Sequence, residues 1–273
     1  MQSSNLSIFL IAFFGAVAGQ PVTAQSLLLP PAYTAASIAS TASTRAGRLA
    51  PNTVFTIYGT DLSFITWAVS SQEIVNQSLP TSTPVGEVYV QLQGRRIPLF
   101  FVSPKQINAL IPADVLPGDR TVRVFRDLVG GPTVSVRVEA EAPEFFRVGT
   151  GFAAATHADG RVITAESPAE EDEVVVVYGT GFGAVGAIEN GVLAPSRPAQ
   201  VLRARDYRIR IEGEELPAEA LLYVGATPFY AGLFQANLRL PKPLGENVRI
   251  EIGVGGNWSG GDLRLNTKKI ATQ

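Results

Sequence analysis

Hydrophobic and polar residues alternate along most of the chain after Pro51, which is the pattern of β-strands with one buried and one solvated face. The alternation predicts strands at residues 52–59, 86–93, 96–103, 106–112, 120–126 and 133–140. The segments between these strands are rich in Gly, Pro and Asp, which favour turns. Strands that recur about every 8–12 residues with turns between them are typical of β-sandwiches.

The second half of the chain repeats this pattern in the same order. The segment DEVVVVYGTGF at 172–182 matches NTVFTIYGTDL at 52–62, and both contain the tripeptide Tyr-Gly-Thr. Further matches pair residues 206–217 with 87–98, 233–241 with 105–112, 246–256 with 119–131, and 262–268 with 133–139. Matches that keep one order along the chain indicate two tandem copies of a single β unit.

We therefore predict an all-β fold of two tandem immunoglobulin-like β-sandwich domains with an ordered connector. The first domain is expected at residues 51–141, the connector at 142–171 and the second domain at 172–268. The connector is expected to be ordered because it contains Phe145 and Phe146, which favour burial, and an Ala-Asp-Gly tripeptide typical of a tight turn.

The alternation also predicts which side chains fill the core of each copy. In the first copy these are Val54, Phe55 or Ile57, Val88, Val90, Phe101, Ile107, Val122 and Val124. In the second copy they are Val175, Val177, Ile209, Ile211, Leu222, Phe234, Leu238, Ile250 and Ile252.

The N-terminal residues 1–24 have the features of a secretory signal peptide. Their apolar segment Leu6–Gly19 is shorter than the about 20 residues of a membrane span. Val22 and Ala24 place small residues ahead of a cleavage site after Ala24. Because Lys and Arg are absent here, a retained N-terminal anchor is the alternative. After cleavage we expect an exported protein (periplasmic, cell-surface or extracellular) with no stable membrane span.

Residues 25–50 follow this segment and are rich in Ala, Ser and Thr. Such a composition is typical of an extended or low-complexity lead-in, so we expect a tether ahead of the first domain. The alternative is a first edge strand that pairs with the strand predicted at 52–59.

The glycines Gly181, Gly183 and Gly186 fit the G-x-G-x-x-G pattern of a dinucleotide-binding turn. That function needs a helix directly after the glycines, because the helix N-terminus binds the pyrophosphate. Pro195 and Pro198 prevent a helix of useful length. We therefore interpret the glycines as a turn at the end of a buried strand and expect no cofactor.

The composition offers few groups for catalysis or metal binding. The chain has no cysteine, and His157 is its only histidine, so thiolate chemistry and a multi-histidine metal site are excluded. We interpret His157 as a turn residue and the acidic run at 170–173 as a solvated turn. The formal net charge of −2 gives no basic surface for nucleic acid. We expect no catalytic residues and no metal site.

Two Gln-x-Asn pairs occupy matching positions in the copies, Gln106 with Asn108 and Gln235 with Asn237. On a strand, residues two apart share one face, and here the opposite face is apolar. One interpretation is that these amides bond neighbouring backbone. The alternative is a polar contact surface for a ligand or for the other copy.

Aromatic residues near loops are the remaining candidates for ligand contact. Tyr230 and Trp258 lie in loop-like segments, where exposed rings stack on sugars. Packing in a core or an interface is the more frequent role of such residues.

The segments APEFF, LFQANLRLP, RLAPNTVFTIYGTDLS, LPTSTPVGEVYVQLQGRRIPLFFVSPKQINALIPADVLPGDRTVRV and ADGRV…SPAEEDEVVVVYGTGFGAV carry a family resemblance. Their order resembles the uncharacterised C-terminal domain family of Solibacter-type acidobacteria over about residues 33–267. The resemblance implies paired immunoglobulin-like sandwiches of the IPT/TIG type in a secreted bacterial protein, and it implies no catalytic residues. The chain departs from the family at His157, where Asn is usual before Ala-Asp-Gly.

These observations predict a non-enzymatic, exported binding or adhesion-type protein whose ligand is a protein or a glycan. A carbohydrate-binding module is the alternative. A hydrolase with a carboxylate pair is a third class, and the spacing of acidic residues gives it no support.

Overall fold

The computed structural model describes residues 29–43, 46–186 and 188–268, and these residues form strands and short 3-10 helices without an α-helix. The fold is an all-β, immunoglobulin-like sandwich, as predicted. Within the described ranges, no helix is long and apolar enough to cross a membrane. The predicted signal peptide at 1–24 lies outside the described residues.

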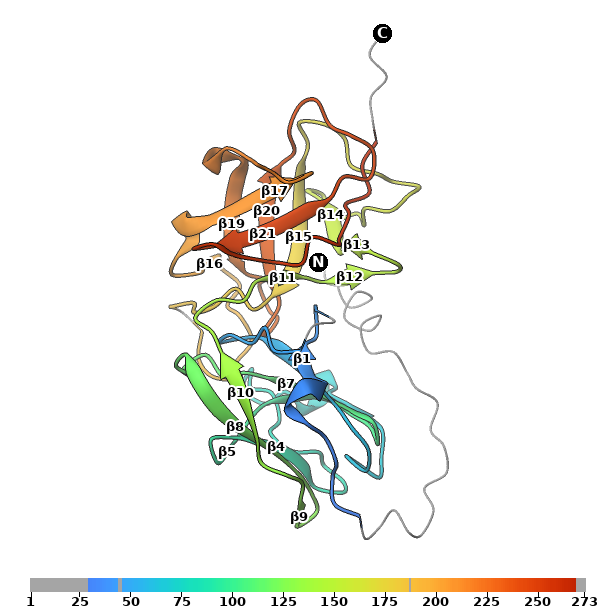
Figure 1. The fold of residues 1–273 in the computed structure, drawn as a ribbon, viewed down its shortest axis with the longest axis vertical. Helices are drawn as coiled ribbons and strands as arrows, with labels where there is room; N and C mark the ends of the chain where they lie inside the picture. The colour runs from blue at the N-terminus through green and yellow to red at the C-terminus, as the bar shows by residue number, and fades with distance from the viewer. Residues whose placement is uncertain (1–28, 44–45, 187, 269–273) are drawn as a thin grey trace.

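The first half of the chain forms the lower part of Figure 1. Its elements are η2 (Ala35–Ser37), β1 (Ile38–Ser40), β2 (Val54–Tyr58), β3 (Trp67–Ala68), η3 (Ser71–Glu73), β4 (Val88–Leu92), β5 (Arg95–Arg96), β6 (Leu99–Val102), β7 (Gln106–Leu110), β8 (Gly118–Arg126), β9 (Val129–Gly130) and β10 (Val134–Val138). One antiparallel sheet has the order β1-β2-β7-β6-β3, and the facing sheet has the order β10-β8-β4-β5.

The second half forms the upper part of Figure 1. Its elements are β11 (Glu144–Phe145), β12 (Arg147–Val148), β13 (Phe152–Ala153), β14 (Ala155–His157), β15 (Val174–Thr180), β16 (Ala199–Gln200), η4 (Ala204–Asp206), β17 (Tyr207–Ile211), β18 (Glu214–Glu215), η5 (Ala218–Ala220), β19 (Leu221–Ala226), β20 (Phe234–Arg239), β21 (Ile250–Val254) and β22 (Asn257–Trp258). Its sheets have the orders β11-β15-β20-β19-β16 and β18-β17-β21-β22.

The pairing registers confirm that the halves repeat one pattern. In the first half β2 pairs with β7, so that Tyr58 lies opposite Gln106. In the second half β15 pairs with β20, so that Tyr178 lies opposite Gln235. Both pairings were expected from the sequence matches. The residue boundaries of two domains stay a prediction.

Alternate residues of the strands fill a hydrophobic cluster in each half. The predicted core residues that are buried are Val54, Phe55, Ile57, Val88, Val90, Phe101, Ile107, Val122, Val124, Val175, Val177, Ile209, Ile211, Phe234, Leu238, Ile250 and Ile252. Burial of each such side chain contributes about 1.5–3 kcal/mol before conformational entropy is subtracted.

Leu222 corrects one core prediction, because half of its surface (50%) is exposed. The pairing of β19 with β20 shifts register between Leu221 and Tyr223. A β-bulge of this kind inserts one residue into the strand and breaks the alternation of inward and outward side chains. Leu222 therefore faces solvent in a segment whose sequence alternates normally.

The segment at 25–50 is more than a tether, because its residues Ile38–Ser40 form β1 and pair with β2. Ile38 and Leu49 are fully buried. The edge-strand alternative is therefore correct for this part of the segment. The connector is ordered, as expected, and supplies the corresponding strand β14 to β15.

The glycine-rich turn after β15 lies where the two halves meet. Gly181 has a φ of +77°, and its carbonyl accepts a hydrogen bond from Ala142 N (2.8 Å). A Cβ on Gly181 would meet Ala142 O more closely than real Cβ atoms approach any atom. Gly183 also has a positive φ and lies against Ala140. These two glycines thus allow close backbone packing.

Replacing Gly181 with Ala is expected to lower the free energy of unfolding by about 2–3 kcal/mol, because the new Cβ meets backbone and the φ is unfavourable. Gly186 is the matched control, since its nearest neighbour is a side-chain atom, Leu202 Cδ2, at 3.3 Å. Gly186→Ala should change stability by less than about 1 kcal/mol. Urea unfolding of both variants measures the difference, and equal losses would contradict the junction role of Gly181.

Candidate functional site

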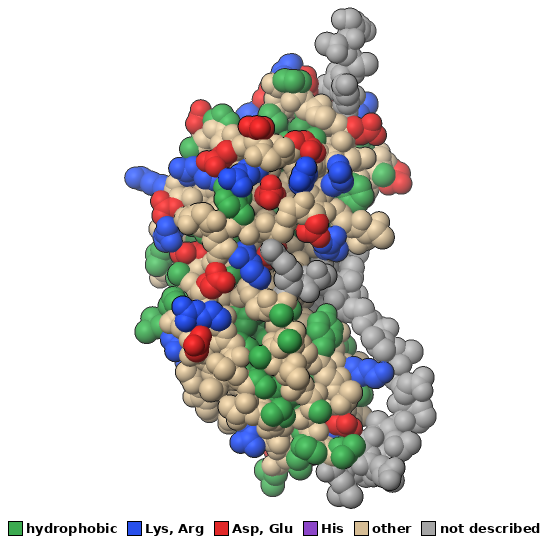
Figure 2. All heavy atoms as spheres, viewed as in Figure 1, with side chains coloured by type: hydrophobic (Ala, Val, Ile, Leu, Met, Phe, Trp, Pro, Cys, Tyr) green, Lys and Arg blue, Asp and Glu red, His purple; other side chains and the backbone are tan. Residues whose placement is uncertain are grey.

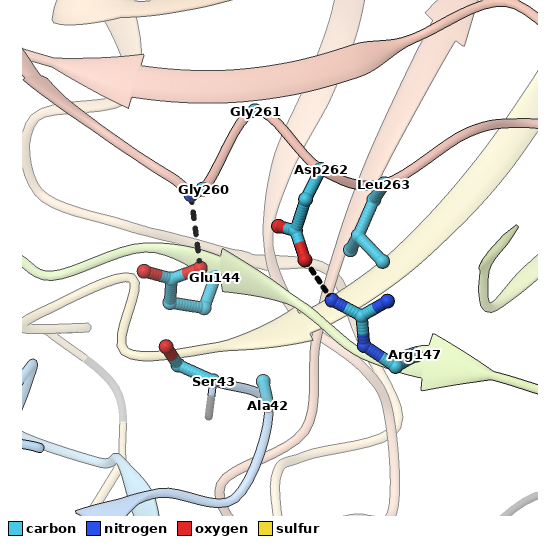
Figure 3. Close-up of a pocket in the computed structure, with 8 residues that line it drawn as sticks. All are labelled: Ala42, Ser43, Glu144, Arg147, Gly260, Gly261, Asp262 and Leu263. Atoms are coloured by element: carbon cyan, nitrogen blue, oxygen red, sulfur yellow. Dashed lines mark hydrogen bonds and ion pairs between the residues drawn. The ribbon is translucent and has the colours of Figure 1, made fainter. Parts of the chain in front are cut away.

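A polar pocket of about 290 Å³ opens between the two halves (Figure 3). The residues that line it are Ala42, Ser43, Glu144, Arg147, Gly260, Gly261, Asp262 and Leu263. They come from three segments far apart in the sequence: the turn after β1, strands β11 and β12 of the connector, and the loop after β22. The pocket exists only because the two halves and the connector pack together.

A buried ion pair holds one wall of this pocket. Arg48 Nε lies 3.0 Å from Glu144 Oε1, and only 15% and 5% of the two side chains are exposed. Glu144 Oε2 accepts a hydrogen bond from Gly260 N at 3.2 Å, which Figure 3 shows as a dashed line. A carboxylate this buried needs such partners, because burial of an unpaired charge is costly.

The same arginine reaches the second half through hydrogen bonds. Arg48 donates to Asn257 Oδ1 and to Trp258 O (3.1 Å). Asn257 Nδ2 in turn donates to Glu139 Oε2 at 2.6 Å and to Glu141 O at 2.7 Å. The guanidinium group of Arg48 therefore connects the turn before β2, the connector and the β21–β22 hairpin.

An ion pair between Arg147 and Asp262 forms the other wall. These side chains are more open to solvent, with 31% and 64% exposed. Each carboxylate at the pocket is matched by a guanidinium group, Glu144 by Arg48 and Asp262 by Arg147. The pocket thus presents hydrogen-bond donors and acceptors with balanced charge, which suits a neutral polar ligand better than an ion.

The Gln-x-Asn pairs lie elsewhere, on the sheets. Gln106 Nε2 donates to Asn108 Oδ1 at 2.9 Å, and Gln235 Nε2 donates to Asn237 Oδ1 at the same distance. The amides of each pair therefore bond one another rather than only the neighbouring backbone. Asn108 is fully buried, and within the described part of the chain its Nδ2 has no hydrogen-bond partner. Neither pair lines the pocket. Their role in ligand contact stays a prediction.

The two predicted aromatic contacts are also outside the pocket lining. The guanidinium carbon of Arg210 lies 3.6 Å from the ring centre of Trp258, and the other neighbour of this ring is Gly253. A sugar stacks on Trp258 only if Arg210 moves away. Tyr230 packs against a small apolar cluster that contains Phe146 and Tyr178.

His157 ends strand β14, and its carbonyl accepts a hydrogen bond from Gly160 N (3.0 Å), which closes the predicted Ala-Asp-Gly turn. Its side chain is 7% exposed, which the sequence did not indicate. Glu173 departs from the expected solvated turn, because its carboxylate is hydrogen-bonded to the His157 ring.

Sequence reasoning missed Arg48, Glu144, Arg147 and Asp262. Glu144 did leave a signal, because it is a charged residue inside the apolar run APEFF. A charged residue in such a run is buried only when it is paired. The partner could not be inferred, because Arg48 and Asp262 are distant in sequence.

No family model and no curated protein matches this chain. Among solved structures, the SGBP-B protein of a mixed-linkage glucan utilization locus of Bacteroides ovatus, in complex with a mixed-linkage heptasaccharide, is similar at 11% identity with a TM-score of 0.33. The match covers 83% of this chain and 44% of that one, so this chain spans less than half of that protein.

SGBP-B from a complex xyloglucan utilization locus of Bacteroides uniformis is similar at 12% identity with a TM-score of 0.22, over 85% of this chain and 49% of that one. Domains 5–6 of the S-layer protein SbsC match at 12% identity with a TM-score of 0.24, over 88% of this chain and 100% of that one. These low scores record a distant likeness and assign no function.

Replacing Arg48 with Ala is expected to lower the free energy of unfolding by about 3 kcal/mol, because it removes one partner of a buried ion pair. The exposed pair of Arg95 with Asp114 gives the control, and Arg95→Ala should cost less than about 1 kcal/mol. Thermal and urea unfolding measure both losses. Equal, small losses would show that Arg48 does not hold the junction.

Proposed function

We propose that this protein is an exported, non-enzymatic binding protein of the adhesion type whose ligand occupies the pocket between the halves. The observation that carries the proposal is the buried Arg48–Glu144 ion pair, which fixes a polar pocket built from both halves and the connector. Ligand sites are frequently concave and frequently lie where two packed units meet.

Rigidity supports this function. Arg48 is bonded to Glu144, Asn257 and the backbone of Trp258, so the polar groups of the wall are held before a ligand arrives. A preorganised site loses less conformational entropy on binding, which raises affinity without further contacts. The segments that form the pocket are joined by this single guanidinium group.

The charge pattern supports a neutral ligand. Figure 2 shows Lys and Arg side chains interspersed with Asp and Glu over the upper half of the visible face, without a large area of one sign. Such a surface gives little long-range attraction for a polyanion. A neutral glycan fits the balanced donors and acceptors of the pocket, and we propose it as the first ligand class to test.

Export is the second part of the proposal and rests on the sequence of residues 1–24. Fractionation of the native host with N-terminal sequencing tests it. Mature protein that begins after Ala24 in the envelope or medium supports export. Cytoplasmic protein that begins at Met1 refutes it.

The binding prediction concerns the exposed wall of the pocket. On a glycan array the full chain should bind at least one neutral glycan, and Arg147→Ala should weaken that binding about tenfold, or about 1.4 kcal/mol. The loss arises because Arg147 presents its donors and also orients Asp262. Isothermal titration with the selected glycan measures the affinity.

The control for this experiment is Asp119→Asn, which breaks an exposed ion pair with Arg137 remote from the pocket residues. It should leave affinity unchanged. Equal binding by wild type and Arg147→Ala would rule out the pocket as the glycan site. An array without any bound glycan would leave a protein as the ligand class.

A further inference from the structure

The only histidine of the chain is hydrogen-bonded to a serine and to a glutamate. His157 Nδ1 lies 2.5 Å from Glu173 Oε1, and His157 Nε2 lies 3.1 Å from Ser167 Oγ. The histidine ends β14, the glutamate precedes β15, and the serine belongs to the loop between them. The order hydroxyl, imidazole, carboxylate is that of a serine nucleophile with its base and orienting acid.

The partners of the imidazole determine where its proton lies. The carboxylate of Glu173 is an acceptor, so neutral His157 carries its proton on Nδ1 and donates it to Glu173. The lone pair on Nε2 then faces Ser167, whose carbonyl is at 3.2 Å and whose hydroxyl is at 3.1 Å. Only the hydroxyl can donate a proton, so Ser167 Oγ–H points at the base.

Neighbouring groups fix this geometry and supply a positive charge. Glu170 N donates to Glu173 Oε2 at 3.0 Å, which leaves Oε1 directed at the histidine. Arg161 Nη1 lies 3.4 Å from Ser167 Oγ, and its Nε is held by Asp159 Oδ2 at 2.7 Å. A guanidinium group at this place can stabilise negative charge that forms next to Oγ.

We propose that Ser167, His157 and Glu173 form an acyl-transfer centre that attacks carboxylic esters. Ser167 Oγ forms a bond to the acyl carbon while its proton passes to His157 Nε2, and Arg161 stabilises the oxyanion. The bond from the acyl carbon to the alkoxy oxygen then breaks, and His157 returns the proton to the leaving alcohol. Water, activated by the same base, hydrolyses the acyl-serine and restores the hydroxyl.

This activity goes beyond ligand binding and would correct the expectation of a chain without catalytic residues. Ser167, His157, Glu173 and Arg161 do not line the pocket between the halves, so the two proposals can fail separately. Ser167 and His157 are the catalytic residues. Glu173 acts through His157 and is a positioning residue.

The experiment treats the full chain with a fluorophosphonate probe and locates the adduct by peptide mass spectrometry. The expected result is one adduct at Ser167, absent in Ser167→Ala. His157→Gln should slow labelling about 100-fold, because the general base is lost. Ser70→Ala is the control, since Ser70 hydrogen-bonds Glu73 without a histidine, and it should label like wild type.

Glu173 is tested by rescue. Glu173→Gln should slow labelling about 100-fold, whereas Glu173→Asp, which keeps the carboxylate, should recover at least part of the rate. Both variants are compared with wild type by thermal unfolding. A folded wild-type chain that gains no adduct at Ser167 overturns the proposal. Equal labelling of wild type and His157→Gln would also overturn it.

Discussion

The junction between the halves depends on one buried hydroxyl group. Thr180 Oγ1 accepts a hydrogen bond from Val54 N (3.0 Å) and donates to Gly232 O (2.8 Å), and the residue is fully buried. It therefore ties the first residue of β2 to the end of β15 and to the loop before β20. The positive φ of Gly181 lets the chain turn directly after this contact. Every element that approaches the pocket follows from this arrangement.

The buried charge at the same junction has a different consequence. A paired Arg48 and Glu144 are weak evidence for high stability, because removing two charges from water costs several kcal/mol, about what their attraction returns. Such a pair does specify geometry, since a shifted junction would leave a carboxylate buried without its partners. The network thus selects one arrangement of the halves, which is what a binding pocket between them requires.

The strands were predictable because alternation of apolar residues directly reports burial on one face of a strand. The matches between copies also placed Tyr58 opposite Gln106 and Tyr178 opposite Gln235. Leu222 was not predictable, since a bulge leaves no mark in the alternation. The pocket was not predictable either, because it depends on which loops the tertiary packing brings together and not on local pattern.

Both candidate centres share one property of the sequence. Glu144, Arg147, His157 and Ser167 all lie in the connector at 142–171, a segment without a match among the repeated strands. The repeated segments have to fill two similar cores, so their residues are constrained by packing. The connector begins the second sheet through β11 and β14 but otherwise lies outside that constraint. Its polar residues are therefore free to serve function, and fold alone does not assign one. The glycines after β15 resemble a cofactor motif, yet their conformation serves the packing that places this connector.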